Sequence, residues 1–474
     1  MASIEKTSPA QSGRPAAGDE LTLTVSGLAH GGAGIARHDG YVVFVDGGFP
    51  SDIVRAVVIK ARRAYAEASA VEIVESSPDR VPERCDQDGP RCPGSPWQGL
   101  RYERQIEHKQ AQVADALARL GEFSDRGDYR LEPIVPAVEP WRYRNKMEYS
   151  FGWRTTGESA GELALGFHPR GEWQRVEDVR DCALASERNN AVRNLVRELS
   201  ARHRLEPYDR RGRTGLLRNL VVREGRRTGA LQVRLVTGEP GFEPQAVADG
   251  LHEQFPEAAF LVTRTDAAAE ISHGGETDVL AGPERLEERL GGLEFQVSPE
   301  AFFQTNTEMA EHLYELAVAY AGLTGSERVY DIYCGIGTLS LLLALRAGDV
   351  LGVDIVESAI ADAINNASLN EIDNARFFAG NARHAIRPLV EEAPRPDVIV
   401  VDPPRAGLSK KVVRRLLEAK PDRIVYVSCN PTTLAPDARE IVDGGFRLTR
   451  VRPVDMFPHT PHIECVALLE RSGG

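Results

Sequence analysis

A cysteine and a glutamate near the C-terminus have the chemistry of a nucleophile and a general base. Cys429 lies in residues 428–431 (Ser-Cys-Asn-Pro), directly after the apolar run 424–427. A free cysteine is usually an inert core residue, but a thiol at a strand tip is a candidate nucleophile. Glu464 opens another apolar strand, where burial would raise its pKa towards the range of a general base. Taken singly, Glu464 could instead be a solvated residue at the rim.

A third polar group follows the apolar run 398–401. Residues 402–405 read Asp-Pro-Pro-Arg, and the prolines restrict the backbone so that Asp402 is held at the strand tip. An aspartate there could merely cap a loop, but the flanking prolines favour a placed polar group. Ligands of open α/β sheets bind at such strand ends, so we expect these groups to share one site.

A glycine turn in residues 329–338 (Val-Tyr-Asp-Ile-Tyr-Cys-Gly-Ile-Gly-Thr) is typical of a nucleoside site. Gly335 and Gly337 allow backbone torsions and a close ligand approach that a Cβ would block. Asp354 ends the next apolar run, where a carboxylate accepts hydrogen bonds from ribose hydroxyls. A Gly-x-Gly alone is a weak signal, but Asp331 before it and Asp354 after it favour a nucleoside site over a structural turn.

Regular alternation of strands and helices from residue 298 onward supplies the sheet that these groups need. We expect helices over 307–321, 358–370 and 410–419, and a further one near Ala382. Buried strands are expected near 329, 350, 376–378, 398–401 and 424–427. Two terminal strands, near 446–454 and 463–469, should pair as a hairpin around 457–459. The fold class is therefore α/β, a doubly wound sheet with an antiparallel edge.

The remaining sequence divides into a tail and two further folded parts. Residues 1–18 are polar and rich in Ser, Ala, Pro and Gly, which predicts a disordered tail without the apolar core of a signal peptide. Residues 19–77 contain short alternating strands that suit an OB-like barrel, a fold that often binds oligonucleotides. A structural β-module without a ligand is the alternative. Residues 78–297 mix strands and helices and predict a central α+β domain, followed by the sheet domain of 298–474.

Charge distribution is more informative than the net charge of −13, which argues weakly against a nucleic-acid partner. Residues 139–238 contain 20 Lys and Arg against 13 Asp and Glu. The arginine-rich stretch 210–227 is either a solvated face or a surface that contacts phosphates. No apolar run approaches the roughly 20 residues that span a bilayer. We therefore expect no membrane partner and a cytoplasmic protein.

Six cysteines without a secretory signal favour thiol chemistry or metal ligation over disulfides. Cys85 and Cys92 lie in a Gly/Pro-rich loop that resembles a metal or iron–sulfur loop. Two thiolates are too few for a cluster, and the nearby candidate for a third is Cys182. These three cysteines are therefore the candidate metal ligands.

The C-terminal half resembles the RNA uracil-5 methyltransferases that use S-adenosylmethionine. The matching motifs are 303–306 (Phe-Gln-Thr-Asn), 331–337, 402–405, 428–431 and 457–459 with Glu464. The N-terminal barrel looks like the TRAM domain that many of these enzymes carry, so the resemblance covers nearly the whole chain. It implies the class I methyltransferase fold.

The resemblance also implies roles for individual residues. Cys429 would be the nucleophile and Glu464 the base. The implied cofactor contacts are Gln304, Tyr333, Gly335, Gly337, Asp354, Asn381 and Asp402. The order of barrel, cysteine loop, central domain and catalytic domain is more like the ribosomal RNA enzymes than the bacterial transfer-RNA ones. We therefore expect a monomer that acts on ribosomal RNA, with transfer RNA as the alternative.

The cysteine loop departs from the family pattern. Members with a cluster place a cysteine where this chain has Ser95, and the gap from Cys85 to Cys92 is one residue longer than usual. A serine alkoxide is a poor substitute for a soft thiolate ligand. We predict that the protein carries little or no four-iron cluster.

Three alternative functions differ in specific residues. An amino-group methyltransferase expects an aromatic residue where Arg405 stands and needs no nucleophilic cysteine. An RNA cytosine-5 enzyme usually has a cysteine directly after the proline of that loop. A non-enzymatic RNA-binding assembly factor would keep the barrel and the arginines without needing Cys429 and Glu464 together.

Overall fold

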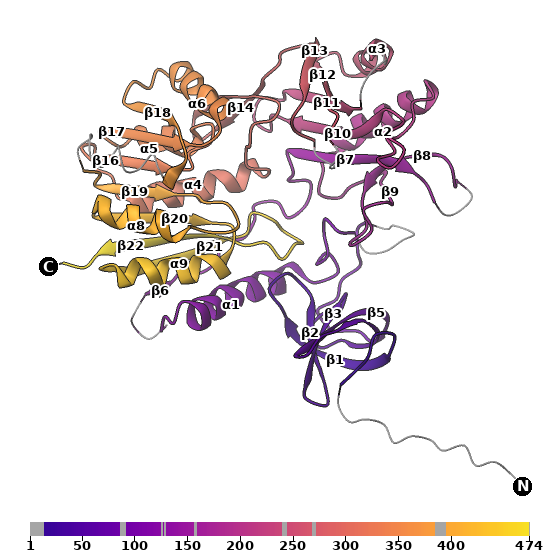
Figure 1. Ribbon diagram of the computed structural model, residues 1–474, viewed down its shortest axis with the longest axis horizontal. Coiled ribbons are helices and arrows are strands. Elements are labelled where there is room, and N and C mark those ends of the chain that lie inside the picture. The colour runs from indigo at the N-terminus through magenta and orange to yellow at the C-terminus, as the bar shows by residue number, and fades with distance from the viewer. Residues whose placement is uncertain are drawn as a thin grey trace, which may run out of the picture. The chain divides into compact units, whose positions relative to one another are not determined.

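The computed structural model describes residues 14–85, 92–124, 127, 129–155, 159–238, 244–267, 272–383 and 395–473 (Figure 1). The chain forms two compact units. The smaller contains residues 1–84, 94–108 and 459–461, and the larger contains 85–93, 109–458 and 462–474. Among the described residues, no helix combines the length and the apolar character that crossing a membrane requires.

The smaller unit is built on a closed five-stranded barrel in the order β1-β2-β3-β5-β4. Its strands are β1 (Glu20–Leu28), β2 (Gly34–His38), β3 (Tyr41–Asp46), β4 (Ile53–Ala61) and β5 (Tyr65–Glu75). Alternate apolar residues point inward, such as Leu23 and Val25 of β1 and Val43 and Val45 of β3, and they are buried. This alternation is the period-two pattern of a half-buried strand, and the expected OB-like barrel is confirmed.

A seven-stranded sheet, β13-β12-β11-β10-β7-β8-β9, lies in the larger unit. Its strands are β7 (Lys146–Trp153), β8 (Leu163–Phe167), β9 (Glu177–Asp178), β10 (Leu217–Glu224), β11 (Leu231–Thr237), β12 (Ala258–Arg264) and β13 (Glu276–Ala281). Helices α2 (Glu187–Arg202) and α3 (Gln245–Gln254) pack on one face (Figure 1). Met147, Leu220, Val222 and Val233 point to that face and join the core with Val192 and Leu251. The opposite face therefore carries the alternate, largely polar residues.

The C-terminal sheet has eight strands in the order β18-β17-β16-β19-β20-β22-β21-β6. Its bounds are β16 (Arg328–Ile332), β17 (Asp349–Asp354), β18 (Ala375–Ala379), β19 (Val398–Val401), β20 (Arg423–Ser428), β21 (Phe446–Val454), β22 (Glu464–Arg471) and β6 (Arg130–Leu131). The strands from β18 to β20 are parallel, and β22 is antiparallel to β20 and β21. Every residue of β19 is buried, as expected for a strand covered on both faces. The doubly wound sheet with an antiparallel edge is confirmed.

Helices connect these strands, and several have the expected bounds. They are α1 (Tyr102–Leu120), α4 (Thr307–Ala321), α5 (Thr338–Ala344), α6 (Glu357–Leu369), α8 (Lys410–Ala419) and α9 (Pro431–Asp443), with the hairpin β14 (Leu286–Leu290) and β15 (Leu293–Val297) before α4. α9 was not predicted, although Asn430 caps it and Pro431 occupies its first turn, both typical of a helix start. The helix expected near Ala382 falls largely on residues 384–394, which lie outside the described residues.

The core of the C-terminal sheet includes residues that precede the central sheet in the sequence. Val113, Ala116 and Leu117 of α1 and Tyr129 pack into it together with β16, β19 and β20. β6 also pairs with β21, with Arg130 opposite Arg450 and Leu131 opposite Val451. Part of the stretch expected to form the central domain therefore stabilises the C-terminal sheet.

Candidate active site

The glycine loop after β16 combines tight packing with an open side. Tyr333 and Gly337 have left-handed torsions, with φ of 75° and 82°. A Cβ on Gly337 would lie 3.1 Å from atoms of Ala363 and Phe377, so this position has no room for a side chain. A Cβ on Gly335 would meet no atom within 4 Å. The space beside Gly335 is therefore free for a ligand.

Asp354 at the end of β17 is held by the loops on either side of it. Its carboxylate accepts hydrogen bonds from the Gly335 N–H at 3.0 Å and from the Val356 N–H at 2.9 Å. It lines a pocket of about 380 Å³ together with Tyr333 and Asn381. A fixed carboxylate at the wall of this pocket can accept hydrogen bonds from the hydroxyl groups of a ligand.

A second pocket, of about 50 Å³, shares Tyr333 with the first. Its lining includes Phe303, Gly335, Asp331 and Asp402. Burial raises the pKa of Asp331 to about 7, opposed by the Ser340 hydroxyl that donates to its carboxylate. Burial, and then the nearby Asp331, also raise the pKa of Asp402 to about 7. A cation in this pocket would favour the ionised form of both groups.

Gln304 joins the second pocket to the start of α4. Its side chain is buried and hydrogen-bonds the hydroxyl of Tyr314, which also lines the second pocket. The backbone carbonyl of Gln304 accepts from Asn145 Nδ2 at 2.9 Å. Two residues later, Asn306 caps α4 by accepting the Met309 N–H. The Phe-Gln-Thr-Asn motif is therefore a rigid wall of the site.

Cys429 follows β20, Glu464 begins β22 and Arg405 lies in the loop after β19, and the three are close enough to interact electrostatically. Burial, followed by the charges of Glu464 and Asp402, raises the pKa of the Cys429 thiol to about 11, and Arg405 opposes this shift. Burial and then Asp402 raise the pKa of Glu464 well above its usual value, and Arg405 again opposes the shift. Glu464 is 4% exposed, whereas Cys429 is partly exposed. The arrangement brings a reachable thiol and a proton-accepting carboxyl group to one place.

Hydrogen bonds tie the loop after β19 to the loop after β20. The Arg405 carbonyl accepts from Asn430 Nδ2 at 3.2 Å and from Thr433 Oγ1 at 3.5 Å. Gly407 has a φ of 74°, and a Cβ there would lie 2.6 Å from an oxygen of Asp437. These contacts hold the backbone of Arg405 beside the Cys429 loop.

The hairpin that leads into Glu464 is held by hydrogen bonds from the side chains of three segments that are far away in the sequence. Asn306 Nδ2 donates to the Met456 carbonyl at 3.0 Å, and Lys109 Nζ donates to the next carbonyl, that of Phe457, also at 3.0 Å. The Tyr143 hydroxyl donates to the carbonyl of Pro458 at 3.2 Å. Three successive carbonyls of the hairpin are thereby satisfied, and the approach of the chain to Glu464 is fixed.

The three predicted metal ligands, Cys85, Cys92 and Cys182, lie near one another. A hydrogen bond with Cys92, and then burial, raise the pKa of the Cys85 thiol, which also senses the charge of Cys182. Burial is the main cause of the raised pKa of Cys182. Among the residues that the structure describes, no three histidine, cysteine or acidic side chains are grouped to hold a metal ion. Burial therefore favours the protonated form of the Cys85 and Cys182 thiols in the metal-free protein.

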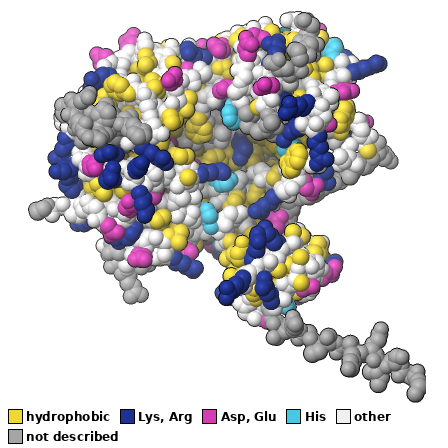
Figure 2. All heavy atoms as spheres, in the orientation of Figure 1, with side chains coloured by type: hydrophobic (Ala, Val, Ile, Leu, Met, Phe, Trp, Pro, Cys, Tyr) yellow, Lys and Arg dark blue, Asp and Glu magenta, His cyan; other side chains and the backbone are white. Residues whose placement is uncertain are grey.

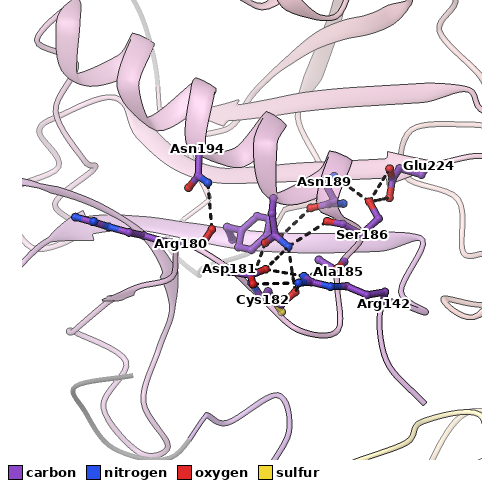
Figure 3. Close-up of polar contacts among 11 residues, drawn as sticks. Arg142, Arg180, Asp181, Cys182, Ala185, Ser186, Asn189, Asn194 and Glu224 are labelled. Carbon is purple, nitrogen blue, oxygen red and sulfur yellow. Dashed lines mark hydrogen bonds and ion pairs between the residues drawn. The ribbon is translucent and has the colours of Figure 1, made fainter. Parts of the chain in front are cut away.

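Cys182 is placed by a polar network in the loop between β9 and α2 (Figure 3). Arg142 donates to the Asp181 carboxylate at 2.6 Å and to the Cys182 carbonyl at 2.7 Å. Asn190 accepts the Cys182 N–H at 2.8 Å and donates to Asp181 at 3.0 Å. The network therefore holds the backbone of Cys182 in place.

The structure brings most of the predicted residues to one edge of the C-terminal sheet. Gln304, Tyr333, Gly335, Asp354, Asn381 and Asp402 line or adjoin the two pockets, while Cys429 and Glu464 lie beside Asp402. Gly337 does not line either pocket and serves packing. Tyr314 was missed, because its place on the inner face of α4 looks like ordinary core. The sequence showed that Arg405 is not the aromatic residue of an amino-group methyltransferase. It did not show that the charge of Arg405 opposes the raised pKa of Cys429 and of Glu464.

Comparisons with known proteins find similar RNA methyltransferases. A family model for tRNA (uracil-5-)-methyltransferases matches residues 283–472, and a TRAM domain model matches residues 16–71. The chain is 39% identical over 454 residues to an RNA methyltransferase of Halalkalibacterium halodurans, covering 95% of this chain and 97% of that protein. It is 38% identical to an RNA methyltransferase of Chlorobaculum tepidum, covering 96% of this chain and 97% of that protein.

A solved structure is similar over nearly the whole chain. It is the tRNA (uracil-54, C5)-methyltransferase of Pyrococcus abyssi in complex with S-adenosyl-L-homocysteine. The match has a TM-score of 0.75 and 27% sequence identity, and it covers 95% of this chain and 100% of the other. The chain therefore belongs to the S-adenosylmethionine-dependent RNA (uracil-5-)-methyltransferase family and carries the TRAM domain.

Proposed function

We propose that this protein methylates C5 of a uridine in structured RNA, with Cys429 as the covalent nucleophile and Glu464 as the base. The observation that carries the proposal is the proximity of Cys429, Glu464 and Arg405 to one another and to Asp402, which lines the second pocket. An amino-group methyltransferase has no use for a thiol at this position. A non-catalytic RNA-binding factor has no use for a buried carboxyl group facing it.

The residues around the two pockets fit S-adenosylmethionine. Asp354 offers a fixed acceptor for ribose hydroxyls, and Asn381 lines the same pocket. The open side of Gly335 admits a ligand, and the carboxyl groups of Asp331 and Asp402 suit a sulfonium cation. When bound, S-adenosylmethionine supplies an electrophilic methyl group. We therefore infer that it occupies both pockets.

The protein's own residues overcome the weak nucleophilicity of uracil C5. The Cys429 thiol gives up its proton to solvent and the thiolate sulfur adds to C6. A C–S bond forms, and the electron pair of the C5–C6 double bond moves into the C4 carbonyl to give an enolate. C5 becomes carbanion-like and would take the methyl group as the bond between that carbon and the sulfonium sulfur breaks, which leaves S-adenosylhomocysteine. Glu464 then takes the C5 proton, the double bond between C5 and C6 re-forms, and the C–S bond breaks to release Cys429.

Electrostatics at the site decide when Cys429 reacts. With a pKa of about 11 it is a neutral thiol in the free protein near neutral pH. Arg405 is the positive charge that lowers the pKa of both Cys429 and Glu464. A cationic methyl donor beside Asp402 would offset the negative charge that disfavours the thiolate. Cofactor binding therefore prepares the nucleophile.

The target uridine must leave its base stack to reach Cys429. We propose ribosomal RNA as the substrate, because the order of barrel, cysteine loop, central domain and catalytic domain is more like that of the ribosomal RNA enzymes than that of the bacterial transfer-RNA ones. Transfer RNA is the second candidate, because the similar solved structure from Pyrococcus abyssi is a tRNA methyltransferase. Mapping 5-methyluridine in both RNAs from cells with and without this protein distinguishes the two.

Two substitutions test the covalent chemistry. Cys429→Ala should abolish methylation while leaving RNA binding largely intact, because no enolate forms. Glu464→Gln keeps the shape of the side chain but cannot accept the C5 proton. RNA should then remain attached through Cys429 and carry the methyl group. The expected signature is a slow band on a denaturing gel, labelled from radioactive S-adenosylmethionine.

The double variant Cys429→Ala/Glu464→Gln is the matched control and should give no slow band. Full turnover by Glu464→Gln would remove Glu464 from the role of base. Methylation by Cys429→Ala would overturn the covalent mechanism and favour an amino-group methyltransferase.

A further inference from the structure

Three cations lie side by side on the face of the central sheet that α2 and α3 leave uncovered. Lys146 of β7 is directly opposite Arg223 of β10 in the antiparallel register. Arg223 pairs with Gln232 of β11, and Arg234 lies two residues after Gln232 on the same strand. Arg234 is therefore the diagonal neighbour of Arg223. Like charges directly opposite each other destabilise a sheet. A cluster of this kind therefore calls for a compensating charge.

The protein itself supplies only part of that compensation. Lys146 faces Glu148 with its nitrogen 3.8 Å from the carboxylate, and Arg234 faces Glu300 at 3.5 Å. Both glutamates are about 40% exposed, at 39% and 42%, so solvent screens them. Three cations against two exposed carboxylates leave a net positive charge.

The two guanidinium groups also keep unused donors. Arg223 and Arg234 are 4% and 1% exposed, and within the described residues the Nε of each has no hydrogen-bond partner. Burial, followed by the positive charges of Arg223 and Arg234, lowers the pKa of Lys146 to about 8. Glu148 opposes this shift. Lys146, with 29% of its side chain exposed, is the member of the cluster that a ligand can reach.

Hydrogen bonds connect this cluster to the candidate active site. Arg223 donates to the carbonyls of Ser298 and Ala301, at 3.2 and 2.6 Å. The next residue, Phe302, is 70% exposed and lines the pocket that contains Asp402. Asn145, adjacent to Lys146, donates to the Gln304 carbonyl. Figure 2 shows Lys and Arg side chains gathered around the hollowed part of this unit.

We propose that Lys146, backed by Arg223 and Arg234, binds a backbone phosphate of the RNA strand that delivers the uridine to Cys429. This inference rests on the proposed function. An RNA strand passing Phe302 towards the pocket carries a phosphate at every nucleotide. A phosphate at Lys146 relieves the repulsion among the three cations and replaces water at an exposed ammonium group. The cluster then holds the strand in register with the catalytic groups.

The test measures RNA affinity separately from chemistry. In a Cys429→Ala background, which does not turn over, binding of an oligouridylate of about 12 nucleotides is titrated against salt concentration. Lys146→Ala should weaken binding by about tenfold and lower the slope of log affinity against log salt by about 1. Lys146→Arg should restore both, because it restores the charge. Binding of S-adenosylmethionine should be unchanged in each variant.

The matched control is Lys411→Ala, which removes an exposed lysine from α8. Its affinity and salt slope should equal those of the parent. A Lys146→Ala variant with an unchanged salt slope, or one whose loss Lys146→Arg does not restore, would overturn the inference. Methylation of cellular RNA by the chain with Cys429 intact is assayed alongside. Its absence would count against the proposed function, whereas an unchanged salt slope with methylation present counts against the phosphate site alone.

Discussion

The buried ion pair between Lys109 and Asp455 is expected to be a major determinant of the C-terminal sheet's stability. The Lys109 ammonium lies 2.6 Å from the Asp455 carboxylate, and both side chains are fully buried. The same ammonium donates to the Phe457 carbonyl at 3.0 Å, in the hairpin that leads to Glu464. Lys109→Met keeps the length of the side chain but removes both interactions.

The expected loss follows from the burial of the pair. Removing one partner leaves an uncompensated charge in the interior, which costs about 3–5 kcal/mol. The exposed pair of Arg119 with Asp115 on the same helix has the same 2.6 Å separation, but its side chains are 77% and 53% exposed. Such a pair contributes at most about 1 kcal/mol, because water screens it. Arg119→Met is therefore the matched control.

Denaturant unfolding followed by a probe in the larger unit measures these differences. Lys109→Met should lose about 3–5 kcal/mol and Arg119→Met at most about 1 kcal/mol. Lys109→Met/Asp455→Asn should recover part of the loss, since the amide needs no counter-ion. Equal effects of Lys109→Met and Arg119→Met, or no recovery in the double variant, would refute the argument that burial gives the pair its importance.

Three further outcomes are expected. Asp354→Ala should weaken S-adenosylmethionine binding by roughly 1–3 kcal/mol in calorimetry, with circular dichroism confirming a folded protein; unchanged affinity would exclude Asp354 as the ribose acceptor. Burial raises the pKa of Asp331 and Asp402 to about 7, so their carboxylates become protonated below that pH. S-adenosylmethionine should therefore bind more weakly as the pH falls through 7, whereas the uncharged sulfur of S-adenosylhomocysteine should show little change; parallel profiles would contradict this. Anaerobically purified protein should carry little iron and sulfide. Ser95→Cys should raise the content of both if the loop keeps the family geometry. An iron content near that of a full four-iron cluster in the unaltered protein would show that the prediction is wrong.

Local signals in the sequence were sufficient for most of the architecture. The bounds of α4 and α8 agree with those expected, because helical periodicity and capping residues are local properties. The parallel strands were recognisable as short apolar runs, since each is covered on both faces. The polar groups that follow those runs, Asp354, Asp402 and Cys429, were found for the same reason.

Pairings between distant residues were decided only by the tertiary structure. β6 joins the C-terminal sheet from a stretch expected to belong to the central domain, and two residues are too few to show a strand pattern. The line of Lys146, Arg223 and Arg234 depends on the register of three strands, and no spacing along the chain reveals it.

The sequence by itself determined the chemistry available at the site: a thiol, a carboxyl group, a glycine turn and an acceptor for ribose, each marked by its residue type and by the strand before it. The tertiary structure alone decided how these groups influence one another. Arg405 opposes the raised pKa of both Cys429 and Glu464, although it is 24 and 59 residues away from them in the chain. Burial and the distance between charges set such shifts, and both arise only when the strands come together.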